Sequence, residues 1–333
     1  MIHVEAPGLL TTVQDLGRWG HQHLGLAPGG AMDADAARIA NLLAGNDPGA
    51  AVLEITLAGP RLILESGTWI AWTGAPSAIT LNDADLPGWR PVWAPAGSRL
   101  SWGGLYRGCR AYLAVGGGIA VPLILGSRST DLRAGIGGLG GRPLQAGDRL
   151  PIGAPRRTGG GPRGSAFWPD WWVRNDAPPP GQPVTLPFIP GPDWQTLPNW
   201  AREALATGAF RVSPRFDRMG LRLSGPALPA PTGPERLSAG VTCGTLQLPP
   251  DGRPILLGVD HQTTGGYPVL GTAAGIARSR LAQLRSGDAV AFRPLPIGAA
   301  QALHRRHERN IRRLAVALEM ASPPDGALKR SSE

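Results

Sequence analysis

The sequence predicts a mainly β protein made of two β-rich domains with a few short helices. The chain has 333 residues, which is enough for two domains of ordinary size. It contains 48 Gly and 35 Pro, and so many chain breakers disfavour long helices and favour short strands joined by tight turns. Hydrophobic residues make up 42% of the chain, so each domain can bury a core of its own.

Short apolar segments separated by turn residues recur along the chain, and their spacing is typical of barrels or sandwiches. The clearest expected strands are 52–57, 61–64, 69–72, 78–81, 99–102, 211–213, 245–248 and 255–259. Helices are few. Asp33 is a good N-cap for one that ends at Gly45, and we expect a second over 198–208.

A faint internal repeat indicates that the two halves are related. Segments 144–150 and 284–290 both place a Gly-Asp turn before a strand, and each follows a strand that runs into a Gly-rich segment. Between the halves, 154–187 is irregular and rich in Pro and Gly. We therefore predict a first domain over 1–153, a linker over 154–187, a second domain over 188–297, and a basic helix and tail over 298–333.

Two segments keep alternative interpretations open. Trp168, Trp171 and Trp172 either pin the linker onto a domain surface or contact a partner. The helix expected over 301–320 is rich in arginine and carries one apolar face, made of Leu303, His307, Ile311, Leu314 and Leu318. Such a helix packs on the protein through its apolar stripe, or lies on a membrane surface or an acidic partner.

The charge distribution argues against several classes of function. The net charge is +9, and Lys329 is the only lysine. A Schiff-base lysine and a phosphate loop ending in Gly-Lys-Ser/Thr are therefore not expected, and an anion would be held by arginines, backbone nests or a metal. The arginines are dispersed and no nucleic-acid motif is present, so we do not expect nucleic-acid binding.

We expect a cytoplasmic protein with no membrane partner. The N-terminus lacks a basic region followed by an apolar run, and the longest apolar run, 111–126, is interrupted by glycines and a proline. The two cysteines, Cys109 and Cys243, have no metal-ligand spacing and are expected to be buried and reduced. Cys243, next to Gly244, also has the setting of a nucleophile.

Two stretches of polar residues are candidate binding sites. The strand expected over 255–259 runs into Asp260-His261-Gln262-Thr263-Thr264-Gly265-Gly266-Tyr267-Pro268. Segment 11–18 reads Thr-Thr-Val-Gln-Asp-Leu-Gly-Arg and is followed by Gly29-Gly30. Polar side chains at a strand end, beside glycines whose backbone N–H groups a ligand can approach, are typical of a site for a small polar or anionic substrate.

These motifs resemble those of the biotin-dependent carboxyltransferase family, also called the allophanate hydrolase subunit 2 or KipA family. The resemblance covers 8–60, then 110–153 with Leu-Gly-Ser-Arg-Ser-Thr-Asp-Leu-Arg-Ala-Gly at 125–135, and finally 211–293 with Asp-Arg-Met-Gly-Leu-Arg-Leu at 217–223. The motif at 260–268 belongs to the same resemblance. His261 departs from it, because relatives often have another residue there, such as Arg.

The resemblance implies tandem cyclophilin-like β-barrels and a B-type partner similar to KipI. It also implies one of three roles. The one we expect is that of the C-type subunit of 5-oxoprolinase, which works with B-type and A-type subunits to open 5-oxoproline to L-glutamate using ATP. The alternatives are a carboxyltransferase that moves a carboxyl group from carrier-bound biotin to a urea-like amide, and a non-catalytic KipA-type regulator of a kinase inhibitor. Biotin would have to come from another chain, because Lys329 is unsuitable.

A lactam carbonyl is unreactive, so its opening requires the oxygen to become a leaving group, as phosphorylation by ATP would make it. Such a site needs cations, an acid for Mg²⁺ and donors that fix the ring. Under this hypothesis the catalytic candidates are Asp15, Asp260 and Gln262. The substrate-binding candidates are Gln14, Arg18, Arg128, Ser129, Thr130, Arg133, Arg218, Thr263, Thr264, Gly265, Gly266 and Tyr267. ATP and Mg²⁺ would be shared with the partner protein.

Each of these residues also has an ordinary structural interpretation. In that interpretation Asp15 caps a turn, Gln14 and Gln262 satisfy buried backbone groups, and Arg133 pairs with an acid nearby. His21 and His23 have no evident third ligand, so no metal site is predicted within the chain.

Overall fold

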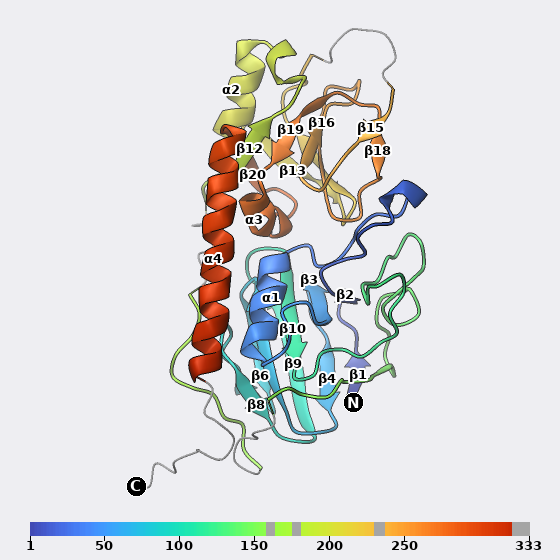
Figure 1. The fold of residues 1–333 in the computed structure, drawn as a ribbon, viewed down its shortest axis with the longest axis vertical. Helices are drawn as coiled ribbons and strands as arrows, with labels where there is room; N and C mark the ends of the chain where they lie inside the picture. Colours follow the sequence, from blue (N-terminus) through green and yellow to red (C-terminus); the bar gives the residue numbers. More distant parts are fainter. Residues whose placement is uncertain (158–163, 175–180, 230–236, 322–333) are drawn as a thin grey trace.

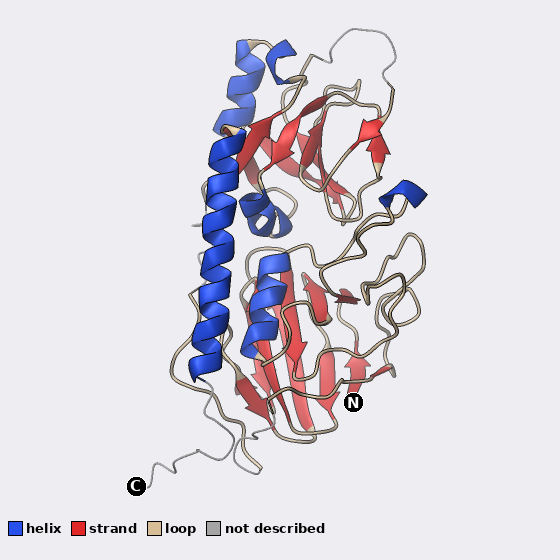
Figure 2. Cartoon of the chain, viewed as in Figure 1, coloured by secondary structure: helices blue, strands red, loops and turns tan. Residues whose placement is uncertain are grey.

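The computed structural model describes residues 1–157, 164–174, 181–229 and 237–321. It contains two β units, with one long helix, α4, running beside both (Figures 1 and 2). The N-terminal unit contains β1 (Ile2–Ala6), β2 (Leu10–Gln14), η1 (Gln22–Leu24), α1 (Ala34–Leu43), β3 (Val52–Thr56), β4 (Arg61–Leu64), β5 (Thr68–Gly74), β6 (Ser77–Leu81), β7 (Ala84–Asp85), β8 (Val92–Ala94), β9 (Ser98–Leu105), β10 (Arg110–Val115) and β11 (Arg149–Leu150).

The remaining elements are β12 (Val184–Pro190), η2 (Trp194–Thr196), α2 (Asn199–Thr207), β13 (Phe210–Phe216), β14 (Gly220–Ser224), β15 (Ala239–Gly240), β16 (Thr245–Gln247), β17 (Ile255–Leu257), β18 (Thr264–Gly265), β19 (Val269–Ala273), η3 (Gly275–Ala277), α3 (Arg278–Ala282), β20 (Ala289–Pro294) and α4 (Ile297–Ala321). The predicted fold class, mainly β with two tandem β units and a few helices, is confirmed. Of the two β-barrels that the resemblance implies, the C-terminal unit forms a closed barrel, whereas the N-terminal unit forms two sheets. The exact domain boundaries remain a prediction, although β12 begins inside the predicted linker.

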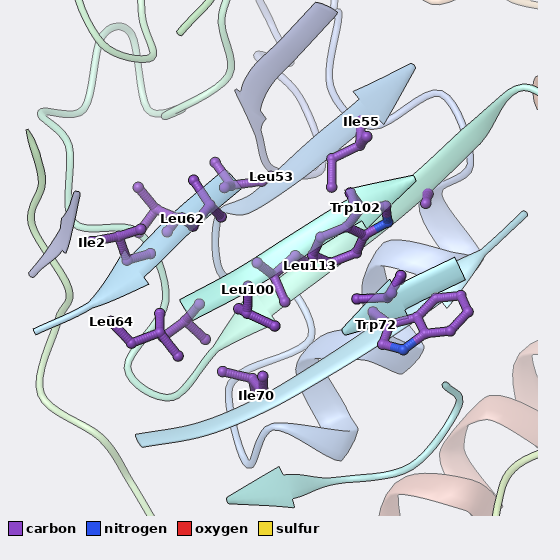
Figure 3. Packing of buried hydrophobic residues seen from close by; sticks show 14 of the residues in the cluster. Ile2, Leu53, Ile55, Leu62, Leu64, Ile70, Trp72, Leu100, Trp102 and Leu113 are labelled. Atoms are coloured by element: carbon purple, nitrogen blue, oxygen red, sulfur yellow. The ribbon is translucent and has the colours of Figure 1, made fainter. Parts of the chain in front are cut away.

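The N-terminal unit consists of two sheets, ordered β11-β1-β4-β9-β6-β7 and β2-β3-β10-β5-β8. Its main core gathers side chains of both sheets, including Ile2, Leu62 and Leu100 from one and Leu53 and Leu113 from the other (Figure 3). All seven residues of β5 are buried. The reason is that alternate side chains of this strand face either the core or α1.

Helix α1 forms where the sequence predicts it. The Asp33 carboxylate accepts a hydrogen bond from the Ala36 backbone N–H (3.1 Å), and Gly45 follows the helix in the left-handed conformation (φ 79°). Small side chains on one face, Ala36, Ala37 and Ala40, are buried against β5 and β10. Helix α2 also agrees with the prediction, ending at the left-handed Gly208.

The C-terminal unit is a closed barrel in the order β12-β19-β16-β17-β14-β13-β20. Parallel pairing of β12 with β20, from Val184↔Val290 to Phe188↔Pro294, completes the closure. Phe188 packs against both Trp194 and Phe292, with ring centroids 5.3 and 5.4 Å away. These rings fill the barrel core.

The predicted repeat has the same geometry in both units. The Gly147 N–H donates to the Val4 carbonyl at 2.8 Å, and the Gly287 N–H donates to the Val212 carbonyl at 2.8 Å. Asp148 and Asp288 each accept a bond from the backbone N–H three residues earlier. Identical turns at equivalent places indicate that the two units are related.

Helix α4 has 25 residues and is longer than the short helices that the composition suggests. It lies along the surface of both units and is not confined to the core of one of them (Figure 1). It packs through part of the predicted apolar face: Ile311 is buried and Leu318 lies against the α1 cluster, but Leu303 is 42% exposed. The Arg38 guanidinium in α1 binds both Glu308 oxygens at 2.8 and 2.9 Å. The packed-helix interpretation is therefore confirmed.

The linker residues 164–174 lie on the N-terminal unit. Phe167 pairs with Trp93 through two backbone hydrogen bonds, Trp168 packs on the core, and the Arg90 guanidinium lies 5.3 Å from the Trp172 ring centroid. Lys329 and the linker prolines at 178–180 lie outside the described residues. None of the described helices combines the length and apolar character needed to cross a bilayer.

Candidate functional site

Asp15 organises the first candidate motif. Its Oδ1 accepts hydrogen bonds from the Ser127 and Ser129 hydroxyls, both at 2.6 Å, and from the Gly17 N–H at 2.9 Å. Its Oδ2 accepts one from the Arg128 N–H at 2.6 Å. The carboxylate therefore joins segment 15–17 to segment 127–129, and the structure brings these two predicted groups together.

Two buried side chains beside this junction keep polar atoms unused. Arg18 is 1% exposed; its Nε donates to the Ile124 carbonyl (2.9 Å) and its Nη2 to the Ser129 carbonyl (3.0 Å). Gln14 donates to the Thr130 carbonyl (3.1 Å). Arg18 Nη1 and Gln14 Oε1 find no hydrogen-bond partner within the described part of the chain. Buried unpaired polar atoms are costly, and a ligand or water would satisfy them.

The first motif reaches the second unit through the glycines at 29 and 30. Ala31 donates its backbone N–H to the Asp15 carbonyl (2.8 Å), and Gly29 donates to the Val259 carbonyl (3.2 Å). Gly30 has φ 87°, and a Cβ on it would lie 2.7 Å from the Gly17 nitrogen. This close approach is possible only without a side chain.

Arg218 holds the two units together. Its Nε and Nη2 bind the Asp260 carboxylate at 2.7 and 3.0 Å, its Nη1 binds Glu54 Oε1 at 2.5 Å, and Nη2 also donates to the Gly30 carbonyl at 2.7 Å. Arg218, Asp260 and Glu54 are 5%, 9% and 1% exposed. A guanidinium engaged in this way positions backbone and carboxylates, and has little capacity left for a substrate.

Glu54 is surrounded by donors. Its Oε2 accepts bonds from the Met32 N–H and the Tyr112 hydroxyl, each at 2.8 Å, and Arg110 Nε lies 3.6 Å from Oε1. Burial by itself would raise the pKa of Glu54, but the charges of Arg218 and Arg110 outweigh it and lower the pKa. Burial also raises the pKa of Tyr112, so the phenol stays a hydrogen-bond donor.

The motif after Asp260 follows the barrel strand β17. Gln262 Nε2 donates to Gln247 Oε1 at 3.2 Å, and β18 pairs with β15. Gln247 is 1% exposed, and its Nε2 is unpaired among the described residues. Thr264, Gly266 and Tyr267 are exposed.

His261, in the same motif, is buried. Burial lowers the pKa of its imidazole, whose Nδ1 lies 2.5 Å from the Gln262 carbonyl oxygen.

The predicted site residues therefore fall into two neighbouring groups joined by segment 28–31. Arg133, which is exposed, reaches the second unit, with Nη1 3.9 Å from Met219 Sδ. Its guanidinium pairs with neither Asp131 nor Asp148: Asp131 accepts from the Arg133 backbone N–H, and Asp148 binds Arg142. The catalytic and substrate-binding roles of all these residues stay predictions.

Sequence reasoning missed Glu54, Arg110, Ser127, Gln247 and Gln283, which complete the site and the contact between the units. Gln283 accepts from the Cys109 and Arg110 N–H groups at 3.1 and 3.0 Å. A lone charge inside an apolar strand, as at Glu54, was the signal in the sequence that could have found it.

The cysteines are buried as expected, and burial raises the pKa of the Cys243 thiol, which disfavours a nucleophilic role.

The fold and this two-unit site agree with the comparison to known proteins. Residues 24–294 match the family described as carboxyltransferase domain, subdomain A and B. The chain belongs to this family, which confirms the resemblance seen in the sequence.

Two relatives share most of their length with this chain. It is 38% identical over 321 residues to the C subunit of 5-oxoprolinase from Escherichia coli (strain K12), covering 96% of this chain and 99% of that protein. It is 33% identical over 300 residues to the C subunit of 5-oxoprolinase from Haemophilus influenzae, covering 89% and 92%. Among solved structures, K. lactis urea amidolyase superposes with a TM-score of 0.82 at 31% identity, covering 94% of this chain but only 20% of that one.

Proposed function

We propose that this chain is the C-type subunit of an ATP-dependent 5-oxoprolinase, acting with a KipI-like B-type subunit and an A-type subunit to open 5-oxoproline to L-glutamate. The observation that carries the proposal is the end-to-end match with the C subunit of the Escherichia coli 5-oxoprolinase, 96% of this chain and 99% of the relative. Urea amidolyase matches over only a fifth of its length.

The side chains of the proposed site suit a small polar amide. Arg128 donates through Nε to the Val121 carbonyl at 2.8 Å, and no other partner of its guanidinium lies in the described chain. Arg128 and Arg133 can therefore bind a carboxylate such as that of 5-oxoproline. Gln262, Thr263 and Thr264 supply amide and hydroxyl groups for the ring, with Tyr267 at the rim. In this proposal Asp15, Asp260 and Arg218 position these groups.

The donor set does not suit Mg²⁺-bound ATP. Both oxygens of Asp15 and both of Asp260 already accept hydrogen bonds. The single cluster of potential metal ligands found in the described chain, Asp35, His307 and Glu308, lies on α1 and α4, where Arg38 already binds Glu308. We therefore assign ATP and Mg²⁺ to the partner protein and derive no phosphoryl-transfer step from this chain.

Carboxyl transfer from biotin is the second candidate, favoured by the TM-score of 0.82 to urea amidolyase. The same arginines and amides would then bind a urea-like amide. Biotin would arrive on a separate carrier protein. This function predicts dependence on biotinylated carrier and bicarbonate.

The test is reconstitution of the full chain with its B- and A-type partners from the same genome. We expect glutamate to form from 5-oxoproline and ATP only when all three proteins are present. Arg128→Ala should lower this rate about tenfold or more through the lost charge-assisted bond, while Arg99→Ala, at an exposed arginine, should not. A stable complex without glutamate formation contradicts the proposal, and carboxyl transfer to urea in its place would establish the second candidate.

A further inference from the structure

A cavity with polar and apolar lining lies between the two units on the side of the helices. Its volume is about 500 Å³, and its wall draws on α1, the turn before β10, α3, the turn before β20, and α4. None of the site residues predicted from the sequence lines it. Figure 1 places α1, α3 and α4 on the side of the molecule away from η1 and β15, so the cavity and the candidate site lie on different sides of the contact between the units.

Three arginines of the cavity wall, Arg107, Arg280 and Arg285, have no acidic partner among the described residues. Arg107 makes no hydrogen bond or ion pair with any residue in the described ranges. The guanidinium of Arg280 donates only to the Thr185 carbonyl (2.9 Å), and that of Arg285 only to the Tyr106 carbonyl (3.2 Å). A guanidinium has five donors, so most of these donors have no partner in the described chain.

Three acids also line the wall: Asp33, Asp35 and Asp288. Asp33 accepts from the Ala36 N–H and from Gln283 Nε2. Asp35 is neutralised by His307 (2.8 Å) and Arg38 (3.4 Å). Asp288 accepts from the Arg285 backbone N–H. Among the described residues of the wall, four arginines (Arg107, Arg174, Arg280 and Arg285) outnumber the three aspartates, so the balance of their charge is positive.

The rest of the wall is apolar. Ile39, Ala75, Pro76 and Trp89 line it. Trp89 adopts φ 57°, a left-handed conformation that costs energy for a residue with a Cβ. Strained residues of this kind concentrate at ligand sites. An apolar wall with a few convergent polar groups at a contact between domains is typical of a small-molecule site.

We propose that this cavity binds a small organic anion, with its carboxylate or phosphate at Arg107 and Arg285 and its apolar body against Ile39 and Trp89. Such a ligand would contact both units at once. Its binding would therefore stabilise their relative position. Gln283, in the wall, also contacts Arg110, which lies beside Glu54 in the contact that holds the candidate site.

The test uses three probes with one aromatic body: 2-naphthoate, 2-naphthyl phosphate and the neutral 2-naphthamide. Calorimetric titration of the full chain should show saturable binding of at least one anion, with the amide at least about tenfold weaker. The bound anion should also raise the melting temperature. Whichever anion binds more tightly identifies the acidic group that the site prefers.

Arg107→Gln locates the site, because it breaks no contact with the described chain and should leave the fold intact. It should weaken the anion about tenfold or more, while Arg99→Gln should leave the affinity unchanged. The proposal is overturned if neither anion saturates the protein, if the amide binds as tightly as the acids, or if Arg107→Gln binds like the wild type. None of these measurements depends on the 5-oxoprolinase reaction, so their outcome is independent of the proposed function.

Discussion

The carboxylate of Glu54 lies in the middle of a strand whose neighbours Leu53 and Ile55 are fully buried. It accepts hydrogen bonds from Met32 and Tyr112, and pairs with arginines from both units. A buried charge is tolerated only when it is matched in this way. The ion pair with Glu54 holds the Arg218 side chain in place, and Arg218 in turn holds the Asp260 carboxylate at the start of the second motif.

Replacing Glu54 by Gln should destabilise the protein by about 3–5 kcal/mol, because Arg218 and Arg110 would lose a buried counter-charge. Denaturant unfolding of the two proteins measures the difference. Glu65→Gln is the matched control: its pair with Arg149 lies at the surface, where such pairs contribute about 0–1 kcal/mol. Equal losses for the two variants would contradict the role given to Glu54.

At the scale of elements, segments 15–18 and 28–31 connect the strands of one unit to the other. The backbone of Gly17 and Gly30 meets where no Cβ fits. Helix α4 connects the units a second time, through ion pairs with α1. The geometry of the site therefore depends on how these connecting elements pack, and not on their intrinsic secondary-structure propensity.

Gly30→Ala should cost more stability than Gly25→Ala, although both glycines have similar φ angles of 87° and 80°. Both substitutions carry the left-handed cost of about 1–2 kcal/mol. Only at Gly30 does the new Cβ meet backbone, 2.7 Å from the Gly17 nitrogen, whereas nothing lies within 4 Å at Gly25. The extra cost should be about 1–3 kcal/mol, measured by denaturant unfolding. Equal costs would show that the close approach is unimportant.

The ion pair between His307 and Asp35 should make the attachment of α4 depend on pH. The hydrogen bond and charge of Asp35 raise the pKa of His307 above its ordinary value of about 6.5. Burial acts to raise the pKa of Asp35, but His307 and Arg38 lower it on balance. The stabilisation is therefore present near pH 5–6, between the two ordinary pKa values of about 4 and 6.5. It is lost as the pH rises through the raised pKa of His307 and as it falls through the lowered pKa of Asp35.

Comparing the wild type with His307→Gln across this pH range measures the effect. The difference in unfolding free energy should be greatest near pH 5–6 and should shrink by about pH 9. His304→Gln, at an exposed neighbour on α4, serves as the control for helix propensity. A difference independent of pH would contradict the titration of His307.

At the scale of the whole molecule, two related β units form one structure because their contact is charged and buried. Met32, from the N-terminal unit, is part of the second unit's hydrophobic core, and Arg110 donates to the Ala282 carbonyl at 2.6 Å. Contacts of this kind couple the folding of domains. We expect the wild type to unfold in a single thermal transition.

Arg218→Met should separate that transition into two, because it leaves Glu54 and Asp260 without their shared partner. Differential scanning calorimetry measures this directly. Arg99→Met, at an exposed ion pair, should retain one transition. A single transition in Arg218→Met would show that α4 and the apolar contacts suffice to couple the units.

Local signals predicted much of the fold. Strand β4 agrees with its predicted limits, and the other predicted strands in both units differ only at their ends. The helix N-cap at Asp33 and the helix end at Gly208 could be predicted because both depend only on residues that are close in the sequence. The short helix α3 was missed, since five residues carry too little periodicity to be recognised.

The sequence by itself determined the β class, the repeated Gly-Asp turns and the two polar motifs, because each depends on neighbours along the chain. Only the tertiary structure decided that Asp15 joins the serines at 127 and 129, that Arg218 binds acids from both units, and that Arg107 lines a cavity between the units. These contacts join residues far apart in the sequence or from different units. Their energies depend on burial and on charges brought together by folding, which no local pattern of residues contains.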